Sequence, residues 1–469
     1  MNNTYTSLVK QTFHFPQEGF DKNDNGYLEF NGLDLKAIIE KHGTPLKLTY
    51  LPKIGMQINK AKKMFADAFK KHKYEGEYYY CYCTKSSHFS FVLDEVLQND
   101  VHIETSSGFD IDIVRNLYDS GKLTPGRYII CNGYKPKKYI ENIARLTAET
   151  DLKVIPVVDN IQEVSDLIQA TEGVEKDIEI GIRIASEEEP KFEFYTSRLG
   201  VRYREIVPLY KNIVLNNPRV KIKMLHFFIN TGINDTAYYW NELTKLLRVY
   251  CDLKKVCPEL DSLNIGGGFP IKKSLQFDFD YAYMVKEILT QVKRVCSDND
   301  IPEPHIFTEF GSFTVGESGG AIFSVLHQKQ QNDREKWNMI DSSFMTNLPD
   351  TWAINQRFIM LPINRWNDDY ERVLLGGLTC DSDDYYNSEQ HSNAIYLPKF
   401  SKHRTLYIGF FNTGAYQETI GGFGGLKHCL IPEPKHVLIK RDENGKIKTE
   451  LFSQEQTADE FLKILGYTK

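Results

Sequence analysis

The stretch Leu263-Asn264-Ile265-Gly266-Gly267-Gly268 is the most informative part of the chain, because a strand-like run leads directly into three consecutive glycines. Without a Cβ, a glycine backbone can approach an anion closely and point several N–H groups at it. A glycine-rich turn by itself is more often only a turn. The place of the three glycines in the chain makes them a candidate phosphate-binding loop.

Short β-branched runs alternate with long amphipathic segments on both sides of this stretch. Residues 136–147 and 237–256 are two of the amphipathic segments. Eight strands, each separated from the next by a helix, predict a TIM-type (β/α)8 barrel of the α/β class. The predicted strands are 78–84, 102–105, 128–131, 154–158, 179–184, 221–228, 262–265 and 304–308.

The three glycines follow the seventh predicted strand. In barrels of this type, the loops after strands seven and eight frequently form a phosphate site. A doubly wound open sheet fits the alternation less well, because its dinucleotide-binding loop follows the first strand.

The pattern changes after residue 319, where short strands follow one another without helices between them. This change predicts a second, all-β domain with strands at 321–327, 337–340, 373–378, 405–411 and 436–440. A short strand at 27–30 and a helix at 33–41 precede the barrel. We therefore predict an N-terminal segment, 1–45, that packs on the C-terminal β-domain, 313–469, with the barrel at 46–312 between them.

Composition excludes several classes of function. The 469 residues suffice for two cores, and the net charge of −6 is spread without a basic stripe, so no nucleic-acid partner is expected. No apolar run is long enough to span a bilayer, so we expect a cytoplasmic protein without membrane contact. The eight cysteines show no metal-ligand spacing, so reduced thiols and no bound metal are expected.

Reactive groups in a barrel enzyme lie at the carboxyl ends of the strands. Lys85 follows the first strand, where an apolar surrounding can lower a lysine pKa and favour imine formation. Glu309 follows the last strand and can bind a protonated ring nitrogen. Each residue alone is also compatible with a simple salt bridge. Together with the glycine loop, they are the parts needed to hold pyridoxal 5′-phosphate (PLP).

At this point the sequence resembles the PLP-dependent basic amino-acid decarboxylases of the alanine-racemase-like fold. The resemblance covers nearly the whole chain and is closest to biosynthetic arginine decarboxylases. The pair Cys380-Asp381 also occurs in ornithine decarboxylases, whereas Gln417-Glu418 favours arginine. The matching motifs are ICNGYK at 130–135, LPDTW at 348–352, TCDSD at 379–383 and GAYQE at 414–418.

The resemblance implies a role for each group around the cofactor. Lys85 forms the covalent link to PLP, and Glu309 pairs with the pyridine nitrogen. The phosphate is held by the glycine loop and by the hydroxyl of Tyr416. Glycine-loop residues in this role are Gly266, Gly267 and Gly268.

The resemblance also assigns residues to the reaction. Cys380 delivers a proton to Cα after CO2 has left, and Asp381 faces the distal cationic group of the substrate. Asp341 is a second candidate acid for this cation, although a turn or solvated acid is an equally good interpretation of it. Active sites of the family lie at a dimer interface, so a homodimer is expected in which Cys380 and Asp381 serve the neighbouring subunit.

The chain departs from the family pattern at the cofactor site. Relatives have histidine where this chain has Phe228, which can still stack on the cofactor ring, and Thr231 can still bind the phosphate. His226 lies two positions earlier on the same face and is an alternative stacking group. Ser312 stands where relatives usually have an arginine at the phosphate. The chain also lacks room for the helical insertion of the larger arginine decarboxylases.

The resulting prediction is decarboxylation of arginine to agmatine and CO2, in polyamine and spermidine biosynthesis. The alternatives are decarboxylation of ornithine, lysine, diaminopimelate or a carboxylated polyamine. A racemase is disfavoured by Glu309, because racemases of this fold place an arginine on the ring nitrogen. A non-catalytic regulator is disfavoured because Lys85, Cys380 and the glycine loop are all present.

Overall fold

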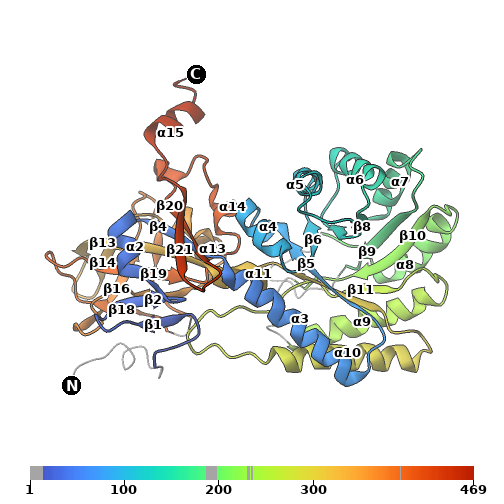
Figure 1. The fold of residues 1–469 in the computed structure, drawn as a ribbon, viewed down its shortest axis with the longest axis horizontal. Coiled ribbons are helices and arrows are strands. Elements are labelled where there is room, and N and C mark those ends of the chain that lie inside the picture. The colour runs from blue at the N-terminus through green and yellow to red at the C-terminus, as the bar shows by residue number, and fades with distance from the viewer. Residues whose placement is uncertain (1–13, 186–197, 230–232, 234–235, 391, 469) are drawn as a thin grey trace. The chain divides into compact units, whose positions relative to one another are not determined.

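The computed structural model describes residues 14–185, 198–229, 233, 236–390 and 392–468. The chain forms two compact units (Figure 1). One contains Gly55–Pro270 and Phe279–Thr314. The other contains the described residues of Met1–Ile54, Ile271–Asp278 and Val315–Lys469. Among the described residues, none of the helices has the length and apolar character needed to cross a membrane.

Eight parallel strands close into a barrel in the first unit, so the predicted barrel is confirmed. Consecutive strands pair in order, and the last strand closes the ring on the first, with Ile306 opposite Tyr78. The strands are β5 (Tyr78–Cys83), β6 (His102–Thr105), β7 (Tyr128–Cys131), β8 (Lys153–Val158), β9 (Ile178–Arg183), β10 (Val220–His226), β11 (Ser262–Asn264) and β12 (His305–Phe310).

Helices connect successive barrel strands, as the amphipathic segments indicated (Figure 1). The predicted segment 136–147 corresponds to α6, which buries Tyr139, Ile140, Ile143 and Leu146. The barrel interior is filled by apolar side chains such as Ile130. Helix α3 (Pro52–His72) precedes the first barrel strand, and the connecting helices are α4 (Ser90–Leu97), α5 (Gly108–Asp119), α6 (Lys137–Glu149), α7 (Ile161–Ala170), α8 (Tyr203–Leu209), α9 (Thr236–Lys254) and α10 (Tyr281–Asp298).

The second unit contains a ten-stranded sheet. It is mostly sheet, which confirms the predicted β-domain, and it also carries the short helices α12 (Phe344–Asn347), α13 (Pro349–Ala353), α14 (Gln417–Gly421) and α15 (Ala458–Ile464). Its strands are β4 (Leu46–Tyr50), β13 (Gly319–Gln330), β14 (Lys336–Ile340), β15 (Ile359–Pro362), β16 (Tyr370–Gly376), β17 (Tyr385–Tyr386), β18 (Ile395–Pro398), β19 (Tyr407–Phe411), β20 (Lys435–Arg441) and β21 (Ile447–Ser453).

The N-terminal segment packs on this larger sheet. Strands β1 (Phe20–Lys22), β2 (Leu28–Phe30) and β3 (Leu33–Asp34) form a small antiparallel sheet of their own. Helix α2 (Leu35–His42) begins after Asp34, whose carboxylate caps its first backbone N–H groups. Apolar residues of this segment share one core with β4, β20 and β19.

Candidate active site

Lys85 lies directly after β5, in the short 3-10 turn η1 (Thr84–Ser86). Its Nζ is 3.0 Å from both carboxylate oxygens of Glu104 on β6. The side chain of Glu104 is fully buried, whereas that of Lys85 is 41% exposed. The turn is fixed because the Ser86 hydroxyl donates to the Cys83 carbonyl and the Thr84 hydroxyl to the Glu104 carbonyl. Lys85 is therefore both reachable and oriented at the carboxyl end of the barrel.

Glu309 lies in β12 and accepts hydrogen bonds from several strands. The amide groups of Asn264 and Asn132 donate to Oε1 at 2.7 Å and 2.9 Å. His226 Nε2 lies 3.2 Å from Oε2. Burial alone would raise the pKa of Glu309, but His226, Lys85 and Asn132 outweigh it and hold this pKa well below its ordinary value. The side chain therefore stays anionic and is suited to pairing with a protonated nitrogen.

Asn132 connects the two buried carboxylates. Its Nδ2 donates to Glu104 at 3.0 Å and to Glu309 at 2.9 Å. Both partners only accept, so the NH2 group must face them. Asn132 lies inside a family motif but was not predicted to have a role, and Glu104 and Asn264 were not predicted as site residues. The available signal was a polar or acidic residue near the carboxyl end of an otherwise apolar strand.

The glycine loop cannot accommodate side chains. A Cβ on Gly267 would lie 2.4 Å from the Glu309 carbonyl oxygen, and one on Gly266 would lie 2.8 Å from the Phe227 carbonyl oxygen. Gly266 and Gly268 have φ of 65° and 99°, which disfavour other residues. The Gly266 N–H donates to Asn264 Oδ1 at 2.9 Å. Asn264 thus holds the start of the loop and Glu309 together.

The other residues predicted at the cofactor have different surroundings. Phe228 is half-buried, with the Arg183 guanidinium 5.7 Å from its ring centroid. His226 is engaged with Glu309. Ser312 begins the short helix α11 (Ser312–Val315), and Thr231 lies outside the described residues. The stacking role of Phe228 and the phosphate contact of Thr231 stay predictions.

Cys380 and Asp381 lie in an exposed loop that follows β16 in the second unit. Buried Asp384 anchors the loop, because its carboxylate accepts from the backbone N–H of Phe344 and from the N–H and hydroxyl of Thr379. Cys380 Sγ lies 3.5 Å from a second thiol. A hydrogen bond with that thiol, Cys429, raises the pKa of Cys380. Cys380 therefore keeps the proton that its predicted role requires.

Two family motifs meet in the second unit. The Gln417 amide donates to the Asp350 carboxylate at 2.7 Å, and the Gln417 carbonyl oxygen accepts from the Asp350 N–H at 3.3 Å. Both side chains are buried. Tyr416 precedes α14 and has φ of 69°, a left-handed backbone conformation. The two motifs therefore form one local structure that presents Tyr416.

Asp341 is bonded to its own unit. The Ser324 hydroxyl and backbone N–H donate to its two oxygens at 2.7 Å and 3.0 Å, and the Thr44 hydroxyl donates as well. Burial raises the pKa of Asp341 against these hydrogen bonds. The contacts occupy both oxygens, and a substrate role for Asp341 stays a prediction.

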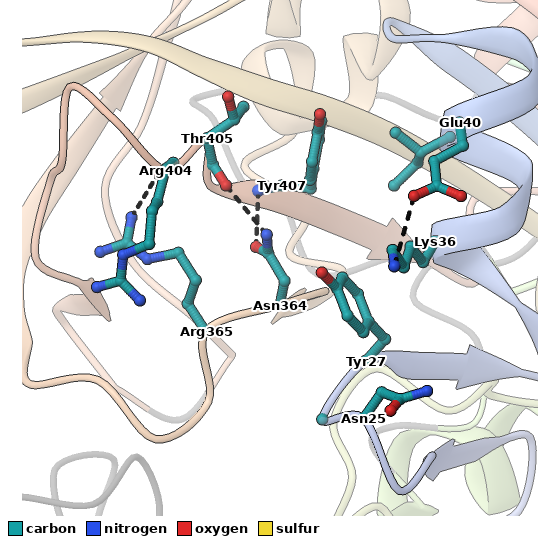
Figure 2. Close-up of a pocket in the computed structure, with 11 residues that line it drawn as sticks. Asn25, Tyr27, Lys36, Glu40, Asn364, Arg365, Arg404, Thr405 and Tyr407 are labelled. Carbon is teal, nitrogen blue, oxygen red and sulfur yellow. Dashed lines mark hydrogen bonds and ion pairs between the residues drawn. The ribbon is translucent and has the colours of Figure 1, made fainter.

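A cavity of about 540 Å³ lies in the same unit (Figure 2). None of the predicted site residues lines it. Its two arginines, Arg365 and Arg404, both bind the carboxylate of Asp368. Its lysine, Lys36, pairs with Glu40 at 3.5 Å. Each of these cations therefore has a carboxylate partner, although the two arginines share the single carboxylate of Asp368.

Residues 55–316 match the family model described as the pyridoxal binding domain of pyridoxal-dependent decarboxylases. The chain belongs to this family. It is therefore a PLP-dependent carboxy-lyase, and PLP is its cofactor. The barrel residues fit this group, since Lys85, anionic Glu309 and a loop backbone without side chains lie at or directly after the carboxyl ends of its strands. The buried atoms Asn132 Oδ1 and His226 Nδ1 also lack a hydrogen-bond partner within the described structure.

Similar proteins extend over most of the chain. A biosynthetic arginine decarboxylase of Prochlorococcus marinus (strain MIT 9515) is 24% identical, covering 91% of this chain and 83% of the relative. The alignment spans 547 positions, more than the 469 residues of this chain, so the relative contains segments that this chain lacks. One from Geobacter sp. (strain M21) is 21% identical over 89% of this chain and 84% of the relative.

Solved structures share the fold. The biosynthetic arginine decarboxylase of Campylobacter jejuni superposes with a TM-score of 0.81 at 19% identity, covering 96% of this chain and 89% of that one. Diaminopimelate decarboxylase of M. jannaschii, in complex with L-lysine, gives a TM-score of 0.78 at 19% identity, covering 95% of this chain and 97% of that one. At this identity the likeness supports the fold, and substrate choice must be argued from the residues.

Proposed function

We propose that the enzyme decarboxylates L-arginine to agmatine and CO2. The observation that carries this proposal is the buried Asp350–Gln417 pair, which joins the two motifs that resemble arginine decarboxylases. The names of the relatives at 24% and 21% identity support the same substrate. A cationic substrate also suits a site with an exposed acid, Asp381.

In this proposal the barrel residues bind and orient the cofactor. PLP supplies an electron sink for the electrons left at Cα when CO2 departs. Lys85 would bind it covalently, and Glu104 holds the Lys85 Nζ in position at 3.0 Å. Glu309, held anionic by His226 and Asn132, would keep a proton on the ring nitrogen. The glycine-loop N–H groups would bind the phosphate, apart from that of Gly266, which donates to Asn264.

The second unit supplies the residues that act on the substrate. The protonated Cys380 thiol donates to Cα, which leads to the amine product. The Asp381 carboxylate binds the guanidinium, whose planar fork matches two carboxylate oxygens. We propose that the protein is a cytoplasmic homodimer and that these two residues complete the site of the neighbouring subunit, as the family resemblance implies.

Substrate choice is tested by measuring CO2 release from arginine, ornithine, lysine, diaminopimelate and a carboxylated polyamine. We expect kcat/KM for arginine to exceed that for ornithine and lysine by at least about tenfold, or about 1.4 kcal/mol in the transition state. The Asp381→Ala variant should lose most of this preference, because the guanidinium loses its bidentate partner. A higher efficiency for any other substrate overturns the arginine assignment and leaves the decarboxylase intact.

The shared site is tested by mixing Lys85→Ala, which should lose turnover, with Cys380→Ala, which should lose most amine formation, and by measuring the amine product. A mixed dimer contains one site with both residues intact when the site is built from two subunits. Random pairing of equal amounts should then recover about a quarter of wild-type amine formation at intact sites. A mixture that forms no more amine than its share of Cys380→Ala, although mass spectrometry shows that mixed dimers have formed, places both residues in the site of one chain.

A further inference from the structure

The second unit contains a cluster of three side chains of metal-ligand type, and it includes Cys380, which is also the proposed proton donor. The ligand atoms of Cys380, His428 and Cys429 all lie within 4.8 Å of one another. Two of them, the Cys380 and Cys429 sulfurs, are 3.5 Å apart. All three residues are exposed, so a cation can reach them from solvent.

The separation of the sulfurs fits a shared cation. Two bonds of about 2.3 Å from Zn²⁺, meeting at a tetrahedral angle, place their sulfurs about 3.8 Å apart. A disulfide requires about 2.05 Å, so the thiols are much nearer to the metal-bound arrangement. Two thiolates and one imidazole are also the ligand set that selects zinc and similar thiophilic cations over Mg²⁺ or Ca²⁺.

Both ligand loops are anchored by buried charged residues. Asp384 fixes the loop that carries Cys380 through backbone hydrogen bonds. Lys427, the residue before His428, is buried and bonds to Glu433 and to Asn347. A site assembled before the cation arrives loses little conformational entropy on binding.

The backbone conformation of Cys429 and the position of Asp381 beside His428 are two further features of the cluster. Cys429 has φ of 54° and ψ of 20°, a left-handed conformation inside the turn His428–Leu430. A non-glycine residue held there costs free energy and marks a constrained position. The Asp381 carboxylate lies 3.9 Å from His428 Nε2. This is an ion-pair distance and too long for a hydrogen bond, so a small rotation of the ring would be needed before the imidazole could donate its second nitrogen to this carboxylate, as metal-binding imidazoles commonly do.

We propose that Cys380, His428 and Cys429 bind one Zn²⁺ ion and that this ion inhibits the enzyme. Each thiol loses its proton to solvent as its sulfur–metal bond forms, and water fills the fourth position. Inhibition rests on the proposed function, because the cation removes the proton that Cys380 would donate. Binding itself does not depend on that assignment.

The test uses the reduced holoenzyme after removal of the reductant. Zn²⁺ is titrated by equilibrium dialysis, and reactive thiols are counted with a thiol reagent under native conditions. Cys380 and Cys429 are the only exposed cysteines among the eight, so two thiols should react quickly and both should be protected by zinc. The variants Cys429→Ser and His428→Asn should each weaken binding by at least about tenfold. The exposed His403→Asn is the matched control.

The outcomes separate the two parts of the proposal. One ion per chain, with both thiols restored by a chelator alone, supports the site. If the thiols become reactive again only after a reductant is added, they had formed a disulfide, and the proposed metal site is overturned. Zinc binding that neither Cys429→Ser nor His428→Asn weakens also overturns the site. Turnover of each variant is compared with and without zinc. Binding at these residues without loss of turnover keeps the metal site and overturns both inhibition and the role of Cys380.

Discussion

Replacing Asn132 by leucine tests the link between the two buried carboxylates. In the wild type, one amide nitrogen donates to Glu104 at 3.0 Å and to Glu309 at 2.9 Å. Leucine has a similar shape and no donor. The substitution therefore removes both bonds while the volume of the side chain stays nearly constant.

The magnitude follows from these two bonds. A hydrogen bond to a charged group contributes about 1.5–3 kcal/mol, so losing two should lower the free energy of local opening by about 3–6 kcal/mol. The two bonded oxygens lie within about 6 Å of each other, and at an effective dielectric constant of about 20 their repulsion is about 3 kcal/mol. Without the shared amide, one carboxylate should take up a proton more readily. The decrease in the free energy of local opening caused by Asn132→Leu should therefore be larger at pH 8 than at pH 5.

Hydrogen exchange measured by mass spectrometry gives the local free energies. Peptides covering β6 and β12 should exchange faster in Asn132→Leu, whereas peptides from β20 in the other unit serve as an internal standard. Buried Asn142 donates to the neutral Gly108 carbonyl at 3.0 Å and accepts from the half-exposed Arg145 guanidinium at 3.2 Å, so Asn142→Leu is a control that also loses two bonds, with an expected loss of about 2 kcal/mol. If Asn132→Leu loses no more than Asn142→Leu, the proposed link between Glu104 and Glu309 is refuted.

Three further predictions follow from other parts of the structure. Lys85→Ala should abolish turnover, and borohydride reduction of the wild type should place the pyridoxyl group on Lys85; an adduct on another lysine refutes the assignment. Cys380→Ala should still release CO2 but form more aldehyde and less amine, and unchanged amine production would refute the proton-donor role of Cys380. Burial and Lys47 lower the pKa of His436 to about 3. Its unfolded form therefore binds more protons, so stability should fall between pH 6.5 and 4 by up to about 1.4 kcal/mol per pH unit. In His436→Gln the thermal midpoint should therefore depend less steeply on pH in this range. An unchanged dependence would contradict the lowered pKa of His436.

The barrel was predictable because its strands are parallel. Such strands are buried on both faces and therefore form short apolar runs that stand out from the intervening helices. Strand β4 (Leu46–Tyr50) was missed, although all five of its residues are buried. Its Lys47 suggests an exposed segment, but the partner carboxylate, Glu433 at 2.8 Å, lies far away in the sequence. Local pattern cannot show that such a charge is paired in the interior.

The candidate site was predictable only where a residue's position at a strand end suggested its chemistry. Lys85, Glu309 and the glycine loop met this condition. Glu104 and Asn264 did not, because their importance depends on partners from other strands that barrel closure brings together. Cys429 was not recognised for a similar reason, since its neighbour Cys380 is contributed by a separate loop. Contacts between distant segments are therefore what the sequence pattern leaves undetermined.

Buried charges recur wherever a reactive loop must be fixed. In the second unit, Lys47 and Lys427 both contact Glu433, and burial together with Lys47 lowers the pKa of Lys427 to about 8. A buried ion pair rarely stabilises a protein more than well-packed apolar residues would, because desolvation offsets the attraction. Its geometry is specific, however, since removing one partner leaves a buried charge unpaired. Lys427 before the His428-Cys429 turn is such an anchor, whereas Asp384 after Cys380 fixes its loop by accepting from backbone N–H groups and the Thr379 hydroxyl.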